Sequence, residues 1–477
     1  MFKAIQKYKH EFILAILICI YLTYFTTASF LRYDNFYTGH FDLGNMDQTV
    51  WNTINGRIFQ ASNDDGTIIS RLSYHADFML ILLSPFYLVW DHPKMLLLIQ
   101  TFILGIGAIF IYLIANIILK NKTLGLTFAF LFLMNPAMQF SNLYDFHAVT
   151  IATTTLLASF YFLMKRKYFL MIIFILLSGL TKEQVWATTA FFGLPLILQK
   201  KKGIKFLGAG VTAVSLIIFG FIIWYLIPQN FGREHFALSY YSDFGDTPTE
   251  VIKNIILSPH KLINIFFEES RLDYLKQILM PLGFISLLSP FVLFFSLPDL
   301  LIGLLSNNSQ LRQIYYQYTA AITPFIFISS IFAVKNINKW FPKIKKYYVV
   351  IYLVLATFFS SFYFGPLPFA KKPNIDMFTK PELNKEIIES FLSKIPQSYS
   401  VAATNNLGSH VSHRKHLFTI PVGIDKADVI MFLLNPNSSQ SLDKDLEIVN
   451  NLKNDKNYTE VFKKGDFVVF KKRSILL

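Results

Sequence analysis

Long apolar stretches separated by short clusters of lysine and arginine make up most of the chain. The first stretch, residues 11–31, follows Lys3, Lys7 and Lys9. A membrane-spanning helix needs about 20 mostly apolar residues, and this criterion predicts about eleven transmembrane helices. The other spans are predicted at 95–119, 123–140, 148–164, 168–180, 185–198, 204–227, 278–305 (an in-and-out pair), 319–334 and 347–364. The apolar stretch 78–90 contains Pro85 and is short, so we interpret it as a re-entrant or juxtamembrane helix.

The basic clusters predict how these helices are oriented. Cytoplasmic loops of membrane proteins carry an excess of lysine and arginine. We therefore expect the N-terminus inside and two long loops, 32–77 and 228–277, on the outer face. An odd number of crossings then places the C-terminus outside as well.

The character of the sequence changes after residue 364, where closely spaced prolines indicate a linker. Beyond it the chain is polar, with short apolar runs between predicted helices. The predicted helices are 381–393 and 442–452, the predicted strands are 400–403, 417–420 and 428–434, and a hairpin is predicted over 458–462 and 467–471. We thus expect a transmembrane domain over 1–364 and a small outer α/β domain over 365–477.

Composition indicates a multi-pass membrane protein. Hydrophobic residues make up 53% of the 477 residues and charged residues 16%, whereas soluble domains carry about 25% charged residues. The formal charge of +14 comes from basic clusters between apolar spans, so we expect membrane lipid and no nucleic acid as a partner. The sequence does not predict which proteins, if any, bind to this chain. The single cysteine, Cys19, excludes an intrachain disulfide.

Residues 38–56 carry the most informative polar pattern. Asp42 and Asp47 lie just past a predicted membrane boundary. Apolar residues recur around them at helical spacing, at Phe41, Met46, Val50 and Ile54, which predicts a short amphipathic helix along the membrane. Carboxylates beside a bilayer indicate a site when they face protein or a cavity. The alternatives are that Asp42 caps the helix and that Asp47 lies on a solvated helix face.

The predicted topology places the polar clusters on one side of the membrane, as expected for an active site that opens to the outer leaflet. The candidate site residues are Asp42, Asp47, His75, Asp77, Asp145, His147, Lys182, Glu183, Arg233, Arg312 and Tyr318. Lys182–Glu183 and Asp145–His147 occupy very short turns, where unpaired charges are costly. The H-x-D and D-x-H pairs suit either a divalent metal ion or a hydrogen bond that fixes a histidine tautomer. Ordinary loop polarity and helix capping are the simpler alternative.

Several common catalytic motifs are absent from the sequence. It contains no Gly-rich phosphate loop, no GxSxG elbow and no HExxH run. This argues against nucleotide-driven transport, a serine hydrolase and a zincin.

Six segments of the sequence carry a resemblance to a known superfamily. They are 41–59 (FDLGNMDQTVWNTINGRIF), 73–90 (SYHADFMLILLSPFYLVW), 142–147 (NLYDFH), 181–184 (TKEQ), 297–325 (LPDLLIGLLS to QYTAAITPF) and 406–421 (NLGSHVSHRKHLFTIP). The chain resembles GT-C proteins, polytopic glycosyltransferases that use polyprenyl-phosphate sugars. It is more closely similar to a large family of prokaryotic membrane proteins within that superfamily.

The resemblance implies a catalytic aspartate in the first outer loop, at Asp42. This residue would act as general base on the acceptor or help to hold a metal. A cationic or histidine side chain would stabilise the leaving phosphate, and the candidates are His75, Lys182, Arg233 and Arg312. Many GT-C enzymes have an acidic residue directly after the aspartate, whereas this chain has Leu43. Asp47, one helical turn on, is the candidate replacement, and a divalent metal, if bound, would use Asp42, Asp47 and His147.

The leading hypothesis is an inverting, GT-C-like glycosyltransferase at the outer face of the cytoplasmic membrane. The alternatives are a transporter or flippase for a lipid-linked substrate and a non-catalytic membrane scaffold. A transporter more often carries charges at mid-span and inverted repeats, which this sequence does not show. For His410, His413 and Arg414 in the tail we expect a structural role or contact with the second outer loop.

Overall fold

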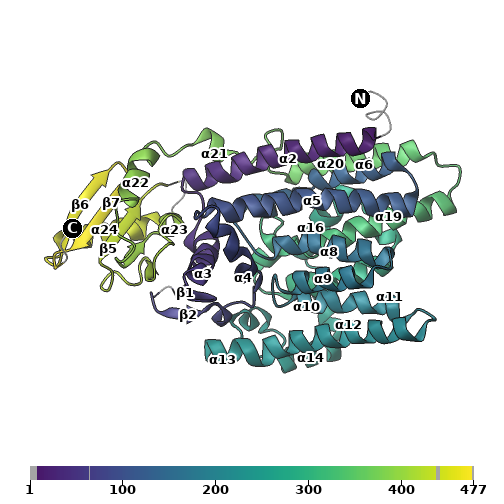
Figure 1. Cartoon of the computed structure of the whole chain (residues 1–477), viewed down its shortest axis with the longest axis horizontal. Helices are drawn as coiled ribbons and strands as arrows, with labels where there is room; N and C mark the ends of the chain where they lie inside the picture. Colours follow the sequence, from purple (N-terminus) through teal and green to yellow (C-terminus); the bar gives the residue numbers. More distant parts are fainter. Residues whose placement is uncertain (1–7, 64, 437–440, 475–477) are drawn as a thin grey trace.

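The computed structural model describes residues 8–63, 65–436 and 441–474, so the predicted cytoplasmic residues Lys3 and Lys7 lie outside the described residues. The chain begins with a bundle of apolar helices and ends in a small sheet domain at one end of that bundle (Figure 1). The helices of the bundle are α2 (Lys9–Asp34), α3 (Asn45–Ile54), α4 (Met79–Leu83), α5 (Lys94–Leu119), α6 (Lys122–Leu133), α7 (Pro136–Leu143), α8 (Thr150–Met164), α9 (Tyr168–Gly179), α10 (Val185–Ala190), α11 (Leu194–Ile197), α12 (Lys202–Phe221), α13 (Ile227–Phe231), α14 (Pro248–Leu257), α15 (Pro259–Phe266), α16 (Glu269–Leu279), α17 (Pro290–Leu293), α18 (Leu297–Leu305), α19 (Thr323–Trp340) and α20 (Lys346–Phe364).

Four helices of the described chain are long and apolar enough to cross a membrane, namely α2, α5, α20 and the helix that runs from Lys202 to Phe231. The pair α6 and α7, which is bent by 46°, would make a fifth. Shorter apolar helices lie beside them with similar axes (Figure 1). These shorter helices correspond to the predicted spans at 148–164, 168–180 and 185–198, so the number of eleven crossings stays a prediction.

The segment 278–305 differs from its prediction as an in-and-out pair of helices. Residues 280–288 form two short 3-10 turns, and only 290–305 form an apolar helix. Gly283 and Phe284 both have positive φ angles, at 58° and 59°, which end helical geometry at this point. The turns pack against α19 and α20. The prediction of two helices is therefore wrong.

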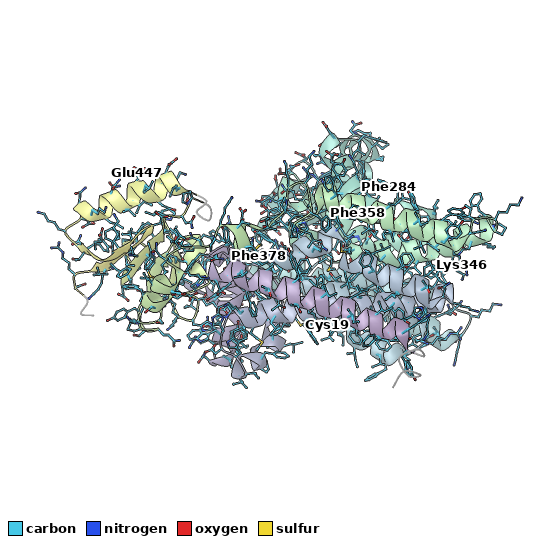
Figure 2. All side chains as sticks on the ribbon, turned by 90° about the horizontal axis from the view of Figure 1, so that it is seen from above. Cys19, Phe284, Lys346, Phe358, Phe378 and Glu447 are labelled. Carbon is cyan, nitrogen blue, oxygen red and sulfur yellow. The ribbon has the colours of Figure 1, made fainter. Side chains whose placement is uncertain are left out.

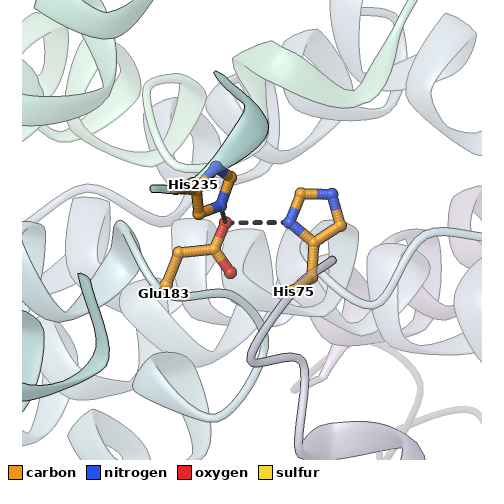
Figure 3. A group of neighbouring side chains, drawn as sticks. All are labelled: His75, Glu183 and His235. Atoms are coloured by element: carbon orange, nitrogen blue, oxygen red, sulfur yellow. Dashed lines mark hydrogen bonds and ion pairs between the residues drawn. The ribbon is translucent and has the colours of Figure 1, made fainter. Parts of the chain in front are cut away.

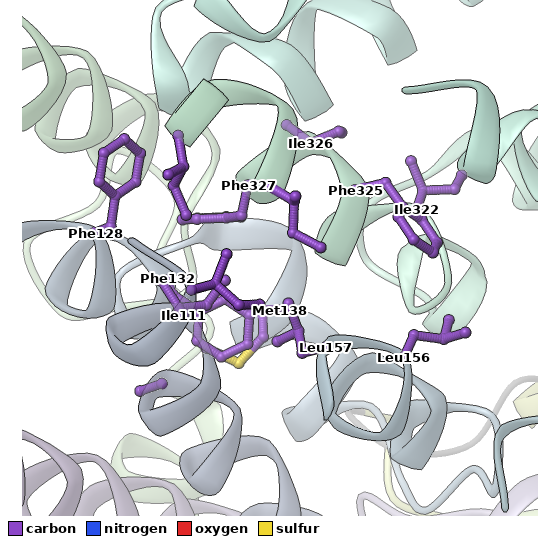
Figure 4. Close-up of a cluster of buried hydrophobic side chains, with 14 of the residues drawn as sticks. Ile111, Phe128, Phe132, Met138, Leu156, Leu157, Ile322, Phe325, Ile326 and Phe327 are labelled. Atoms are coloured by element: carbon purple, nitrogen blue, oxygen red, sulfur yellow. The ribbon is translucent and has the colours of Figure 1, made fainter. Parts of the chain in front are cut away.

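The core of the bundle is apolar and lies between α5, α6, α8 and α19. Figure 4 shows side chains from these helices meeting, with Phe132 and Phe327 edge to face at a centroid distance of 5.4 Å. The outer surface is apolar too: Cys19 on α2, Phe358 on α20 and Phe284 are exposed (Figure 2). An apolar exterior over an apolar core is typical of a helix bundle that faces lipid.

Helix α3 is buried on every side, contrary to the prediction of an amphipathic helix along the membrane. Its polar residues Asp47, Gln48 and Asn52 are all fully buried. The helix packs against α4, the 3-10 turn η3 (Ser84–Leu88) and the strand β1 (Gln60–Ser62), which pairs with β2 (Ile68–Ser70). The segment 78–90, for which a re-entrant or juxtamembrane helix is predicted, packs on α3 as α4 followed by η3.

The tail folds as a mixed five-stranded sheet in the order β4-β3-β5-β7-β6. Its elements are α21 (Asp376–Thr379), α22 (Lys385–Leu392), β3 (Val401–Ala403), α23 (Asn405–Gly408), β4 (Leu417–Thr419), β5 (Val429–Leu433), α24 (Leu442–Asn454), β6 (Tyr458–Lys464) and β7 (Phe467–Lys472). Strand β3 pairs in parallel with β4 and β5, and β6 and β7 form the predicted hairpin. Apolar residues of α22 pack on one face of the sheet and those of α24, which carries Glu447 (Figure 2), pack on the other.

Phe36 and His410 form one group of contacts between the bundle and the tail. Phe36, which follows α2, is fully buried in the apolar core that α22 and the sheet of the tail share. Its ring stacks on His410 of the tail, and the His410 ring also stacks on Tyr33. The C-terminal end of α2 and the tail are therefore packed together.

Candidate functional site

A cavity of about 700 Å³ lies between the bundle and the segments that precede α3 and follow α13. Its polar wall is formed by Asp42, Asn45, Arg71, His75, Asp77, His147, Lys182, Glu183, His235, Tyr240 and Tyr318. Its apolar wall is formed by Val251, Ile252, Ile255, Pro298, Leu301 and Leu305. The cavity combines a cluster of charged groups in its polar wall with an apolar wall, as small-molecule sites commonly do.

Asp42 lies in η1 (His40–Gly44), a π-helical turn that leads into α3. Gly44 is the residue at the N-cap position of α3, so Asp42 does not cap the helix. One oxygen of Asp42 lies 2.9 Å from Nε2 of His147, and the other accepts a hydrogen bond from the Tyr144 hydroxyl at 2.9 Å. The side chain keeps 28% of its surface exposed, toward the cavity.

The charge state of Asp42 follows from these partners. Burial opposes ionisation, but the hydrogen bonds from His147 and Tyr144 outweigh it and hold the pKa of Asp42 below its ordinary value. The carboxylate is therefore ionised at neutral pH. An ionised, oriented carboxylate at a cavity wall can accept a proton from a bound hydroxyl or amine.

Asp145 supports the turn that carries Asp42 and does not line the cavity. One of its oxygens accepts the backbone N–H of Gly39 at 2.8 Å, and the other lies 3.6 Å from the Arg32 guanidinium. Gln100 of α5 shapes the same region, because its amide donates to the backbone oxygen of Asp145 at 2.7 Å and accepts the His147 N–H at 2.9 Å.

Asp47 faces the tail and not the cavity. It is fully buried and contacts the Tyr87 hydroxyl, the Ser412 hydroxyl at 2.5 Å and Nε2 of His413 at 3.0 Å. The solvated-face alternative for Asp47 is wrong. The structure does not bring Asp47 together with Asp42 and His147, so we leave it out of the catalytic and metal-binding residues proposed below.

The opposite side of the polar wall comes from the turn between α9 and α10. Glu183 accepts a hydrogen bond from Nδ1 of His75 at 2.9 Å and one from the backbone N–H of Ala76 at 3.1 Å, and Nε2 of His235 lies 3.6 Å away (Figure 3). Burial and the nearby Lys182 ammonium lower the pKa of His75 to about 4. Burial opposes ionisation of Glu183, but His75 and His235 keep the pKa of Glu183 well below its ordinary value.

Lys182 and Arg71 are the cations of the cavity wall. The Lys182 ammonium lies over the Tyr318 ring, 5.9 Å from its centroid. Arg71 is held by Asp77, 2.8 Å between Nη2 and Oδ2, and donates to the Asn45 side chain at 2.5 Å. Because Arg71 is neutralised by Asp77, Lys182 is the cation better able to respond to a bound anion.

Two predicted phosphate ligands lie outside the cavity wall. Arg233 is exposed and stacks over the Phe231 ring at 4.7 Å. Arg312 donates to the backbone oxygen of Ser306. Neither residue lines the cavity, so both are omitted from the site proposed below.

Some site residues were not among the predicted ones. Arg71, Tyr144 and His235 touch the cavity or Asp42, and Gln100 orients the turn behind them. The signal for Gln100 was present, since a polar residue inside a long apolar span usually has a specific partner. His235 lies two residues after the predicted candidate Arg233 in the second long loop, 228–277.

The sequence matches a family model described as "Predicted membrane protein (DUF2079)" over residues 32–469. The chain is a member of the DUF2079 family. The match covers both the bundle and the tail. The search of curated proteins gave no match.

Solved structures similar to this DUF2079 protein are GT-C glycosyltransferases. ArnT from Cupriavidus metallidurans, solved bound to undecaprenyl phosphate, aligns with a TM-score of 0.58 and 8% identity over 96% of this chain and 97% of ArnT. The Archaeoglobus fulgidus oligosaccharyltransferase aligns with a TM-score of 0.43 and 14% identity, over 88% of this chain and 65% of its own. AglB from the same organism, in complex with an inhibitory peptide and a dolichol-phosphate, aligns with a TM-score of 0.41 and 14% identity. The alignment covers 99% of this chain and 75% of AglB. The likeness to ArnT shows that the DUF2079 chain has the GT-C fold.

Proposed function

We propose that this protein is a glycosyltransferase that moves a sugar from a polyprenyl-phosphate donor to an acceptor at the membrane surface. The observation that carries the proposal is the cavity, which has an ionised carboxylate, Asp42, and a cation, Lys182, in one polar wall beside an apolar wall. The likeness in fold to ArnT, which was solved with undecaprenyl phosphate, supports a lipid-phosphate ligand.

The proposed reaction uses these groups in fixed roles. Asp42, oriented by His147 and Tyr144, accepts the proton of the acceptor as its oxygen or nitrogen attacks the sugar C1. The bond between C1 and the phosphate oxygen breaks, and polyprenyl phosphate leaves. Lys182 stabilises the negative charge that develops on this phosphate. The apolar wall formed by α14 and α18 would hold the first part of the polyprenyl chain.

The residues predicted for a divalent metal, if one is bound, are Asp42, Asp47 and His147. Because Asp47 lies on the tail side of α3, these three residues do not form one donor set. The mechanism above uses no step through such a metal.

The test of the proposal is transfer of radiolabelled sugar from a membrane extract of polyprenyl-phosphate sugars by the purified protein. Asp42→Asn is expected to lower the transfer rate by about 10²–10⁴-fold, because the amide cannot accept the proton. Exposed Glu234, next to the cavity residue His235, gives the matched control Glu234→Gln, which is expected to keep the wild-type rate. Transfer by Asp42→Asn at the wild-type rate would refute the role of Asp42. Wild-type protein without bound polyprenyl phosphate in native mass spectrometry would contradict the proposed donor class.

A further inference from the structure

His75, Glu183 and His235 bring two imidazole nitrogens and one carboxylate oxygen together at the cavity wall. These three ligand atoms all lie within 4.8 Å of one another, and Figure 3 shows both rings facing the same carboxylate. Nδ1 of His75 and Nε2 of His235 lie 2.9 Å and 3.6 Å from the same oxygen, Oε1 of Glu183. The residues come from three separate segments of the chain.

We infer that His75, Glu183 and His235 bind one divalent transition-metal ion of the Zn²⁺ class. Ligands about 2.1 Å from a tetrahedral zinc lie about 3.4 Å apart, and the two N–O distances lie on either side of that value. Two histidines and one carboxylate with an open position are the donor set of catalytic zinc sites. The nitrogen ligands favour Zn²⁺ or Co²⁺ over Mg²⁺ and Ca²⁺, which prefer oxygen.

A second observation points to a ligand at this place. The His235 side chain is 8% exposed, and its Nε2 is a buried atom without a hydrogen-bond partner in the described chain. A buried polar atom of this kind is costly unless something binds it. Glu183 is already positioned, because its other oxygen, Oε2, accepts the backbone N–H of Ala76. Oε1 is therefore presented to the cation as a single ligand atom.

Binding requires both histidines to carry their proton on the other ring nitrogen. In the arrangement shown, His75 donates Nδ1–H to Glu183, and Nδ1 of His235 accepts the backbone N–H of Ala237 at 3.0 Å. When a cation takes Nδ1 of His75 and Nε2 of His235, each neutral ring moves its proton to the remaining nitrogen. The Ala237 N–H then loses its acceptor. This is a local change at the start of η6 (Phe236–Tyr241).

The position of the cation gives it a role that rests on the proposed function. The three proposed ligand residues line the same cavity as Lys182. A dication beside an ammonium creates a strongly positive region, which disfavours an empty pocket and favours a bound phosphate. The ion would therefore bind a phosphate oxygen of the lipid donor, and Asp42 would act on the acceptor at the other side of the polar wall.

The test uses the full-length protein in mild detergent, stripped with a chelator and dialysed. Zn²⁺ is added in competition with a chromophoric chelator, and Co²⁺ is added separately to record its visible absorption bands. One ion per chain is expected for the wild type. Glu183→Gln and His235→Gln are expected to weaken Zn²⁺ binding by more than about 100-fold and to remove the Co²⁺ bands.

The control is His260→Gln, since His260 is an exposed histidine on α15 and keeps the wild-type affinity if the inferred site is correct. Size-exclusion profiles and melting curves establish that each variant is folded. The inference is overturned if the wild type binds no ion, or if folded Glu183→Gln and His235→Gln bind it as tightly as the wild type. It is also overturned if Asp42→Asn loses the ion while both of these variants keep it.

Ion binding is measured without donor or acceptor, so the two proposals fail separately. Asp42-dependent transfer without ion binding would leave the glycosyltransferase proposal standing and refute the metal site. Ion binding without retained polyprenyl phosphate would support the metal site and refute the donor.

Discussion

Two aspartates of one short segment show how position decides what a carboxylate does. Asp42 keeps a quarter of its surface open to the cavity and is oriented by His147 and Tyr144. Asp47 is fully buried and contacts residues of the tail. The sequence places both beside a membrane boundary, but only the packing of α3 separates the proposed base from the structural residue.

Two cations, Lys182 and Arg233, also differ in whether they line the cavity, and this difference gives a prediction. Lys182→Gln removes the ammonium that lines the cavity and is expected to raise the KM for the lipid donor by about 10-fold or more, because a charge-assisted contact to phosphate is lost. Arg233→Gln removes an exposed cation that does not line the cavity and is expected to leave KM unchanged. Steady-state transfer at varied donor concentration measures both. Equal effects of the two substitutions would contradict the assignment of Lys182.

At the scale of elements, the turn η1 is held from outside the bundle by α23 of the tail. The side-chain oxygen of Asn405 accepts the backbone N–H groups of His40 at 2.8 Å and Phe41 at 3.2 Å, directly before Asp42. Gly408 lies against His40, and a Cβ there would lie 2.2 Å from Cβ of His40. The tail thus sets the backbone that presents Asp42 to the cavity.

Asn405→Ala is expected to lower kcat by about 10- to 100-fold with little change in the KM for the donor, because a small misplacement of a reacting group is costly. Asn405 is a positioning residue, so the split between kcat and KM is the informative measurement. Asn450→Ala, an exposed asparagine on α24, is the control. An increase in KM alone, with kcat unchanged, would refute the positioning role.

Elements with strong local signals were predictable from the sequence. The long spans α2, α5 and α20 and all five strands of the tail sheet follow from apolar runs and turn residues. The burial of α3 was not predictable, because its polar face is covered by residues from the far end of the chain. The sequence could not predict that His75, Glu183 and His235 lie together, because they come from three distant segments of the chain. His410 and His413 contact α2 and α3, which fits the alternative of a structural role and not that of contact with the second outer loop.

At the scale of the whole molecule, the docked tail contains a titratable contact. His413 lies 3.0 Å from Asp47 and 3.4 Å from Asp91, stacks on Trp51, and has Tyr87 and Arg414 beside it. Burial favours the neutral ring, but the two carboxylates outweigh it and raise the pKa of His413 above 6.5. The protonated ring therefore stabilises the docked tail at low pH.

The sign of the pH dependence follows from that raised pKa. Stabilisation by His413 is fully present below the unfolded-state pKa of about 6.5 and is lost as the pH rises through the higher folded-state pKa. Melting curves between about pH 6 and about pH 9 are expected to show falling stability in the wild type and a flatter dependence in His413→Gln. The same pH dependence in both proteins would refute this contribution of His413.

Phe36 has a consequence for the order in which the protein is made. Its ring belongs to the core of the tail, yet it precedes α22 and the sheet that enclose it by several hundred residues in the chain and is therefore synthesised well before them. The tail can complete its apolar core only when the C-terminal end of α2 is already in place beside it.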